Sequence, residues 1–215
     1  MATYGGAVDL ILTELHRSDT SITAVVEREI LKSIEFYAPE RFWFNEARAS
    51  FTASSTLYYA LNTIFPATLG YMSSFVEIDQ LSITVGNDVY ELDLQTHQAL
   101  VRIDSNTAHT GDPIEWALFG EKIRLYPVLP SGTVRQIDVD GTRRLATLSA
   151  STDTNAWTNE ALNLIAARTE KNICARKFKD YDAAQVYQLA ETEEYTKLRE
   201  RTEKLLATGR LRASW

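Results

Sequence analysis

The sequence predicts an α+β fold in which N- and C-terminal helices form a helical bundle and a β-rich domain is inserted between them. Apolar residues recur at helical spacing near both ends of the chain, whereas short β-type runs separated by turn residues fill its middle. From these patterns we expect N-terminal core helices in residues 1–39, the β-rich insertion in residues 40–148 and C-terminal core helices in residues 149–208. Residues 209–215 are expected to form an extended docking tail.

Two helices joined by a short capped turn account for the N-terminal segment. Between residues 4 and 17 the apolar side chains fall on one helical stripe: Val8, Ile11, Leu12 and Leu15. Ser18-Asp-Thr20 then supplies residue types that favour a helix N-cap. A second helix is expected to end at Pro39, and its stripe consists of Ile22, Val25, Val26, Ile30, Ile34 and Tyr37.

The middle of the chain is expected to be mostly β. Runs rich in β-branched and aromatic residues predict strands at residues 47–52, 56–61, 83–85, 89–92, 116–119, 123–126 and 134–139. Gly86-Asn-Asp88 and Gly120-Glu-Lys122 separate neighbouring runs and predict two hairpins. Residues 94–103 are consistent with a short helix across this region.

Two further helices are expected after a polar linker at residues 149–155. The first has Thr158 as its N-cap and carries one apolar stripe. The second opens with Asp180 and Asp182, and Gly209 is placed to end it. At about 25–28 residues and about 1.5 Å per residue this helix would be roughly 40 Å long. We therefore expect it to outrun its own domain and to lean on a neighbouring subunit.

Composition argues against several classes of protein. The 215 residues carry a net charge of −7, which disfavours general nucleic-acid binding. Residues 1–150 carry 19 acidic and 11 basic side chains, a balance of −8, whereas residues 151–215 carry 10 and 11, a balance of +1. This asymmetry suits head-to-tail stacking or docking on an acidic partner, and equally a solvated helix of mixed sign. The single cysteine, Cys174, excludes an internal disulfide and suits a reducing cytoplasm.

The sequence contains no motif that predicts catalysis, cofactor binding or metal binding. His16, His97 and His109 lack metal-ligand spacing, and there is no phosphate-binding loop or nucleophile elbow. Close carboxylate pairs, at Glu77 with Asp79 and at Asp138 with Asp140, occur without evidence of a cleft between them. We therefore expect no catalytic residue, no cofactor and no metal site.

Two local clusters have alternative interpretations. Phe42, Trp43 and Phe44 are interpreted as core filling at the junction between helix and strand, with a sugar-binding platform of a small hydrolase or carbohydrate-binding module as the alternative. The alternative that the chain is a nucleic-acid-binding regulator would require a run of basic residues on the C-terminal helices to form one continuous face. That run consists of Arg168, Lys171, Arg176, Lys177 and Lys179.

Several packing and turn patterns stand in order along nearly the whole chain. They occupy residues 18–24, 36–46, 111–120 and 123–127, then Trp157 followed by two helices, and finally residues 208–212. In this order they resemble the head-to-tail adaptor proteins, also called connector or neck proteins, of tailed bacteriophages.

The resemblance implies a structural virion protein rather than an enzyme. Such a protein forms a homo-oligomeric ring, commonly a dodecamer, that binds the portal protein and offers an attachment surface to the tail or the next neck protein. Genomic DNA would pass through the channel without sequence-specific binding, and no membrane would be a partner. The protein would lie in the neck of the virion after assembly in the host cytoplasm. A neck stopper or tail-completion protein is the neighbouring alternative.

The resemblance also implies which residues dock on the portal. Family members keep an α-helical core with a β-rich insertion, and their C-terminal segment reaches into grooves of the portal. In this sequence the corresponding residues are Gly209, as a hinge, and Arg210, Leu211, Arg212 and Trp215. Arginine and tryptophan are among the residue types most enriched at binding hot spots. We expect this tail to become ordered on binding, so that many copies on one ring give high avidity.

Overall fold

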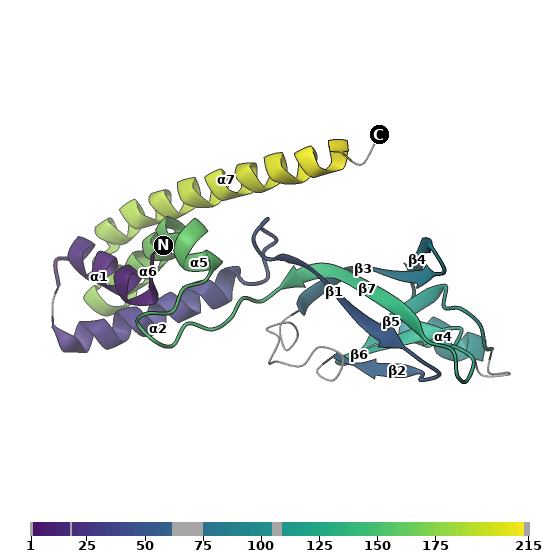
Figure 1. Ribbon diagram of the computed structural model, residues 1–215. Helices are drawn as coiled ribbons and strands as arrows, with labels where there is room; N and C mark the ends of the chain where they lie inside the picture. The colour runs from purple at the N-terminus through teal and green to yellow at the C-terminus, as the bar shows by residue number, and fades with distance from the viewer. Residues whose placement is uncertain (1, 18, 62–74, 105–108, 213–215) are drawn as a thin grey trace. The chain divides into compact units, whose positions relative to one another are not determined.

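The computed structural model describes residues 2–17, 19–61, 75–104 and 109–212. They divide into two compact units (Figure 1). One unit contains Met1–Asn45 together with Leu145–Trp215 and is built from helices. The other contains Glu46–Arg144 and is built mainly from strands. Each unit has its own hydrophobic core.

The helical unit contains α1 (Tyr4–Glu14), α2 (Thr20–Tyr37), α5 (Ala156–Glu160), α6 (Leu162–Ile173), a π-helical turn (Cys174–Phe178) and α7 (Tyr181–Arg212). Side-chain caps fix the helix starts, because the first backbone N–H groups of a helix have no partner within it. Asp19 accepts a hydrogen bond from the Ile22 N–H at 3.0 Å and begins α2. Asn155, rather than the expected Thr158, is the N-cap of α5, and Thr158 completes a reciprocal capping box.

The core of the helical unit joins the two ends of the chain. The predicted stripes contribute Val8, Ile11, Ile22, Val26 and Ile30 from α1 and α2, all of them buried. Trp157, Leu164 and Ile165 contribute from the other end of the sequence. Burial of this apolar surface is the main source of stability for the unit.

The β unit holds a seven-stranded sheet in the order β1-β7-β3-β4-β5-β6-β2. Its strands are β1 (Glu46–Ala53), β2 (Tyr58–Ala60), β3 (Phe75–Val85), β4 (Asp88–Leu94), β5 (Glu115–Phe119), β6 (Lys122–Tyr126) and β7 (Arg135–Arg143). The two expected hairpins, β3–β4 and β5–β6, are present. Gly86 (φ 65°) and Gly120 (φ 60°) lie in their turns, where positive φ favours glycine. β4 and β5 pair in parallel, and helix α4 (His97–Asp104) lies between them in sequence.

The sheet curls around its own core. Phe51 on edge strand β1 and Tyr59 on edge strand β2 have ring centroids 5.2 Å apart, so the two edges approach each other. Leu81, Ile83, Trp116 and Ile137 are among the residues buried in that core. Helix α4 is held to the sheet by the buried Arg124 guanidinium, which donates to Asp104 Oδ2 at 2.8 Å and to the Leu100 carbonyl.

The fold class expected from the sequence, α+β with a terminal-helix bundle and an inserted β-rich domain, is wrong. The chain is a mixed α/β protein with a seven-stranded curled sheet running through its middle and six α-helices among the described residues. The physical reason lies in pairing between distant strands, since β7 joins β1 to β3 and the parallel pairing of β4 with β5 joins the two hairpins into one sheet. Helical and strand periodicity identify single elements and do not specify how strands pair.

Helix α7 differs from expectation at its C-terminal end. It continues through Gly209 to Arg212, so residues 209–212 have helical rather than extended backbone. Trp215 lies outside the described residues. The residues of the helix that pack inward include Ala184, Glu191, Leu198 and Thr202, all buried. Beyond them α7 extends past α5 and α6 of its own unit (Figure 1).

Candidate functional site

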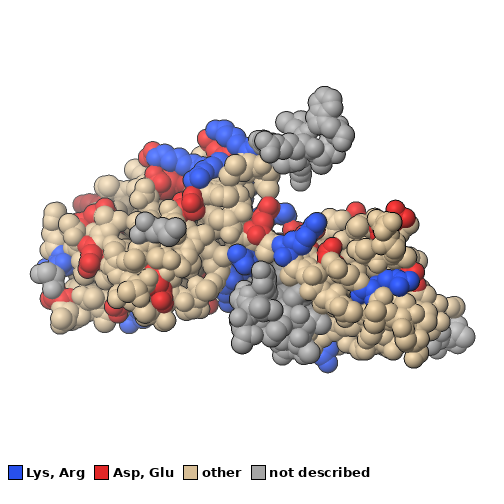
Figure 2. Space-filling model, in the orientation of Figure 1, with Lys and Arg blue, Asp and Glu red and all other residues tan. Residues whose placement is uncertain are grey.

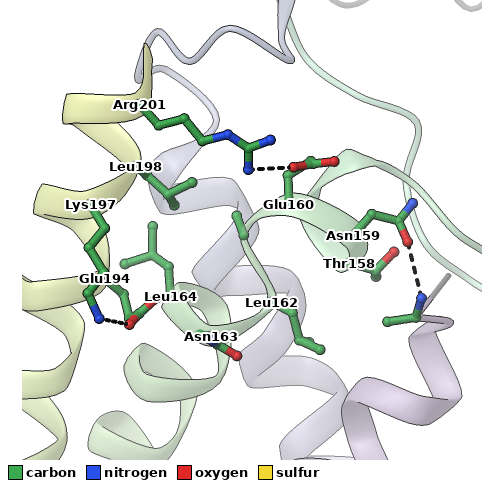
Figure 3. A pocket seen from close by; sticks show the side chains of 12 residues that line it. Thr158, Asn159, Glu160, Leu162, Asn163, Leu164, Glu194, Lys197, Leu198 and Arg201 are labelled. Carbon is green, nitrogen blue, oxygen red and sulfur yellow. Dashed lines mark hydrogen bonds and ion pairs between the residues drawn. The ribbon is translucent and has the colours of Figure 1, made fainter. Parts of the chain in front are cut away.

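A pocket of about 330 Å³ opens on the helical unit between α5, the start of α6 and the middle of α7 (Figure 3). Apolar lining comes from Leu162, Leu164 and Leu198. Asn159 closes one side, because its Oδ1 accepts a hydrogen bond from the Ala2 backbone N–H at 3.1 Å. The pocket therefore combines a small apolar floor with a polar rim.

Both basic side chains at the rim of the pocket are paired with carboxylates. Arg201 donates to Glu160 Oε2 at 2.9 Å, and Lys197 donates to Glu194 Oε1 at 2.8 Å (Figure 3). Lys197 also donates to Glu193 Oε1 at 2.8 Å. Glu193 and Glu194 raise the pKa of Lys197, and Lys197 in turn lowers the pKa of Glu193. The pairs are solvent-exposed, so they order the rim rather than contribute much stability.

The lining of this pocket lacks the paired nucleophile and base of an acyl-transfer site. It contains neither histidine nor cysteine. The Thr158 hydroxyl donates to the Asn155 carbonyl at 2.9 Å and is occupied by the helix cap. A nucleophile needs a base within hydrogen-bond reach, and the lining residues provide no such pair. The arrangement suits binding of a small apolar group with a polar edge.

The aromatic cluster Phe42, Trp43 and Phe44 packs beside this region as part of the helical core. Phe42 is 0% exposed, and its ring contacts those of Phe44, Trp157 and Tyr195 at centroid distances of 5.3, 5.8 and 6.2 Å. The Arg201 guanidinium carbon lies 4.3 Å from the centroid of the Trp43 ring. A sugar platform needs exposed ring faces. Phe42 therefore offers no ring face to a sugar, whereas Trp43 and Phe44 are only partly buried.

An ionic cluster joins α2, α6 and α7. The buried Glu191 carboxylate accepts from Arg168 Nη1 at 2.6 Å, from the Tyr37 hydroxyl at 2.6 Å, and from Lys171 Nζ. Burial and the hydrogen bond to Glu191 raise the pKa of Tyr37. Arg168 and Lys171 are thus neutralised within the unit, whereas Arg176, Lys177 and Lys179, the other members of the basic run, are exposed.

A buried carboxyl group, Glu170 on α6, was not predicted. Glu170 is 2% exposed, and its Oε1 has no hydrogen-bond partner. Burial first, then a hydrogen bond and charge repulsion from Glu14, raise its pKa to about 9. Burial, followed by the charge of Glu170, also raises the pKa of Tyr187 to about 12. Glu170 is therefore protonated at neutral pH.

His97 and Asp140, two of the residues singled out in the sequence, lie in structural settings. The His97 ring stacks on Phe119 at 4.1 Å, and His97 Nε2 is 2.9 Å from the Tyr58 hydroxyl. Asp140 accepts two hydrogen bonds of 2.6 Å from Arg48 across the β1–β7 ladder. Within the described ranges, no group of three or more histidine, cysteine, aspartate or glutamate side chains is arranged to hold a metal ion.

The predicted docking residues and the pocket lie on the same helix. Gly209, Arg210, Leu211 and Arg212 form the last turn of α7, whereas the pocket residues Glu194, Lys197, Leu198 and Arg201 lie several turns earlier. Between them, Leu205 occupies the helical face on which Leu198 and Thr202 are buried, yet it is 46% exposed because the helix has passed its packing partners. The sequence predicted the long helix and gave no signal for the pocket.

No protein-family model matches the chain, and no curated protein matches it. None of the described helices is long and apolar enough to span a membrane.

Proposed function

We propose that the chain is a structural virion protein, a head-to-tail adaptor that assembles as a homo-oligomeric ring, binds the portal protein and offers an attachment surface to the tail or next neck protein. The proposal begins from the order of sequence patterns along the chain. The observation that carries it furthest is the end of α7, where Leu205 is exposed on the face that packs inward earlier in the same helix. An apolar position on a helix that has outrun its own unit is suited to a helix-in-groove contact with a partner.

The rest of α7 has the character of a solvated helix. Lysine and arginine side chains alternate with aspartate and glutamate side chains along it (Figure 2), and Lys197 and Lys204 face carboxylates of their own helix. Such exposed pairs keep a helix soluble without binding anything tightly. The docking contact is therefore assigned to the segment from Leu205 to Arg212, in which the sequence adds Leu211 and two arginines.

Co-sedimentation with portal rings of the same virus tests this function. The full-length chain is compared with a chain truncated after Thr208, with Leu205→Ser, and with Leu189→Ser as the matched control. Leu189 is 73% exposed on the outer face of α7, so its replacement should leave binding unchanged. We expect the truncation and Leu205→Ser to reduce portal binding by about tenfold or more, the scale of a buried anchor residue. Binding of the truncated chain at full strength would refute the α7 contact, and failure of every form to bind would refute the adaptor function.

A further inference from the structure

Positive charge gathers at one corner of the helical unit. This basic corner consists of Arg17, after α1, and Arg176, Lys177 and Lys179, in and after the π-helical turn. All four are exposed, and the Arg17 guanidinium lies 5.1 Å from the centroid of the Phe178 ring, which brings the two segments together. Arg176, Lys177 and Lys179 make no ion pair with any described residue, unlike Arg168 and Lys171.

The backbone of the basic corner is held in an uncommon conformation. Residues 174–178 form a π-helix, a rare element that is frequent at functional sites. His16 (φ 52°) and Lys179 (φ 59°) are the non-glycine residues with positive φ in the described chain, and both lie at this corner. Left-handed backbone costs a non-glycine residue about 1–2 kcal/mol. The turn is nevertheless fixed, because the N–H groups of Lys179 and Asp180 both donate to the Cys174 carbonyl.

The β unit carries a surface of opposite character, the open edge of β4. β4 pairs with β3 from Asp88 to Leu92, but with β5 only at Asp93 and Leu94. The Asp93 N–H donates to the Ile114 carbonyl, so the backbone groups of Asp93 point toward β5. Backbone groups of every second residue in a strand point to the same side, so the N–H and C=O groups of Val89 and Glu91 also point toward the β5 side of β4. In the described residues nothing pairs with them there. Pro113, which has no N–H, precedes β5 where a longer ladder would have to run.

The side chains of this edge are acidic and apolar. Val89, Glu91 and Asp93 share one face of β4 by the same alternation, and all three are exposed, Val89 at 63%. Neither Glu91 nor Asp93 makes an ion pair with a described residue. The sequence of the β unit, residues 46–144, contains 12 acidic and 7 basic side chains, a balance of −5. Two β4 edges paired with each other would therefore bring like charges together, which is destabilising.

We propose that the basic corner of one copy of the chain binds the open β4 edge of a second copy. Arginine and lysine side chains are donors only. The edge offers them the carboxylates of Glu91 and Asp93 together with the carbonyls of Val89 and Glu91, which no described residue pairs. The contact joins two different surfaces, so it is heterologous, the type of interface that closes into rings when the rotation between copies allows it. It rests on the proposed function, for which it names the contact between neighbouring subunits.

Charge reversal with complementation tests the contact. The corner variant is Arg176→Glu with Lys177→Glu, the edge variant is Glu91→Lys with Asp93→Lys, and the control is Lys122→Glu with Arg144→Glu, two other exposed cations. Lys179 is left unchanged because of its positive φ. Association of the full-length proteins is measured by sedimentation velocity over a range of concentration and salt, and circular dichroism confirms that each variant is folded.

We expect the wild type and the control to associate and salt to weaken the association. The corner variant and the edge variant should each associate about tenfold or more weakly when alone. An equimolar mixture of the two should recover association, because each reversed surface then meets its complement.

Three results would overturn this contact. The wild type could remain monomeric at all concentrations, the corner variant could associate like the wild type, or the mixture could fail to recover association. Loss of binding to a DNA oligonucleotide in the corner variant, with self-association unchanged, would instead assign the corner to phosphate groups. Co-sedimentation with portal rings separates the two proposals, since a monomeric chain that still binds portal rings refutes this contact and leaves the adaptor function standing.

Discussion

Replacing Glu170 by glutamine should stabilise the protein, and should do so more strongly as the pH rises. The buried Glu170 carboxyl has a pKa raised from its ordinary value of 4.5 to about 9. A carboxyl whose pKa is higher in the folded than in the unfolded state contributes stability that is fully present below about pH 4.5 and is lost as the pH rises through about 9. Glutamine resembles the protonated carboxyl in shape and never ionises, so the variant does not lose this contribution.

The size of the effect follows from the pKa difference. One pKa unit corresponds to about 1.36 kcal/mol, so between pH 4.5 and pH 7 the undiscounted loss for wild type is roughly 3.4 kcal/mol. Glu14, the interacting carboxyl, is exposed, and water screens part of the repulsion. We therefore expect Glu170→Gln to gain about 1.5–3 kcal/mol at pH 7 and close to zero at pH 4.5.

Urea unfolding followed by helical circular dichroism at several pH values between 5 and 8 measures this gain. Glu14→Gln is the matched control. It removes the second carboxyl but leaves Glu170 buried, and burial is the largest cause of the pKa shift, so the control should recover a smaller part of the stability. The reasoning is refuted if the free energy of unfolding of Glu170→Gln relative to wild type does not increase with pH, or if the variant is less stable than wild type at pH 8.

Three further predictions concern stability and local order. Glu191→Ala should destabilise the protein by about 3–5 kcal/mol in urea unfolding, because it leaves Arg168 without its buried partner. The control Glu193→Ala, at an exposed position, should change stability by about 0.5 kcal/mol or less. Equal effects of the two substitutions would contradict the role of the ionic cluster. Phe42→Ala should cost about 3–5 kcal/mol by opening a cavity in the helical core, and a stability change below about 1 kcal/mol would show that the ring is not core. Arg124→Met should speed amide hydrogen exchange in α4 while leaving the β1–β7 ladder protected; unchanged exchange in α4 would mean that the ion pair with Asp104 does not hold the helix.

The sequence predicted individual elements well and their assembly poorly. Stripes at helical spacing placed Val8, Ile11 and Ile30 in a core, and turn residues placed the hairpins at Gly86 and Gly120, because these signals are local. The parallel pairing of β4 with β5, which joins the two hairpins, and the pairing of β7 with β1 and β3 depend on contacts between distant residues. Periodicity carries no information on such contacts, and for that reason the expected fold class was wrong.

The buried Glu170 and the ionic cluster around Glu191 also depend on contacts between helices, which local sequence patterns did not predict. The one stripe expected on the helix at residues 162–173 describes a helix buried on one side, but α6 packs against α1, α2 and α7. Its buried arc is therefore wider than the stripe and includes Glu170, a residue type that is almost never buried unless paired. Similarly, Arg168 and Lys171 looked available in the sequence because their partner, Glu191, lies on another helix.

The end of α7 also shows what local signals leave open. Gly209 was expected to end the helix, since glycine is common just after a helix C-terminus. The structure continues the helix to Arg212. A single glycine inside a helix costs only about 1 kcal/mol, which neighbouring helix-forming residues offset.

Electron cryomicroscopy of portal rings incubated with the full-length chain tests the adaptor function most directly. We expect an additional ring of density on the portal, with the C-terminal end of α7, from Leu205 onward, in contact with it. Portal rings that carry no added density after saturating incubation would contradict the adaptor function. An added ring in which the C-terminal end of α7 points away from the portal would contradict the docking role of that helix.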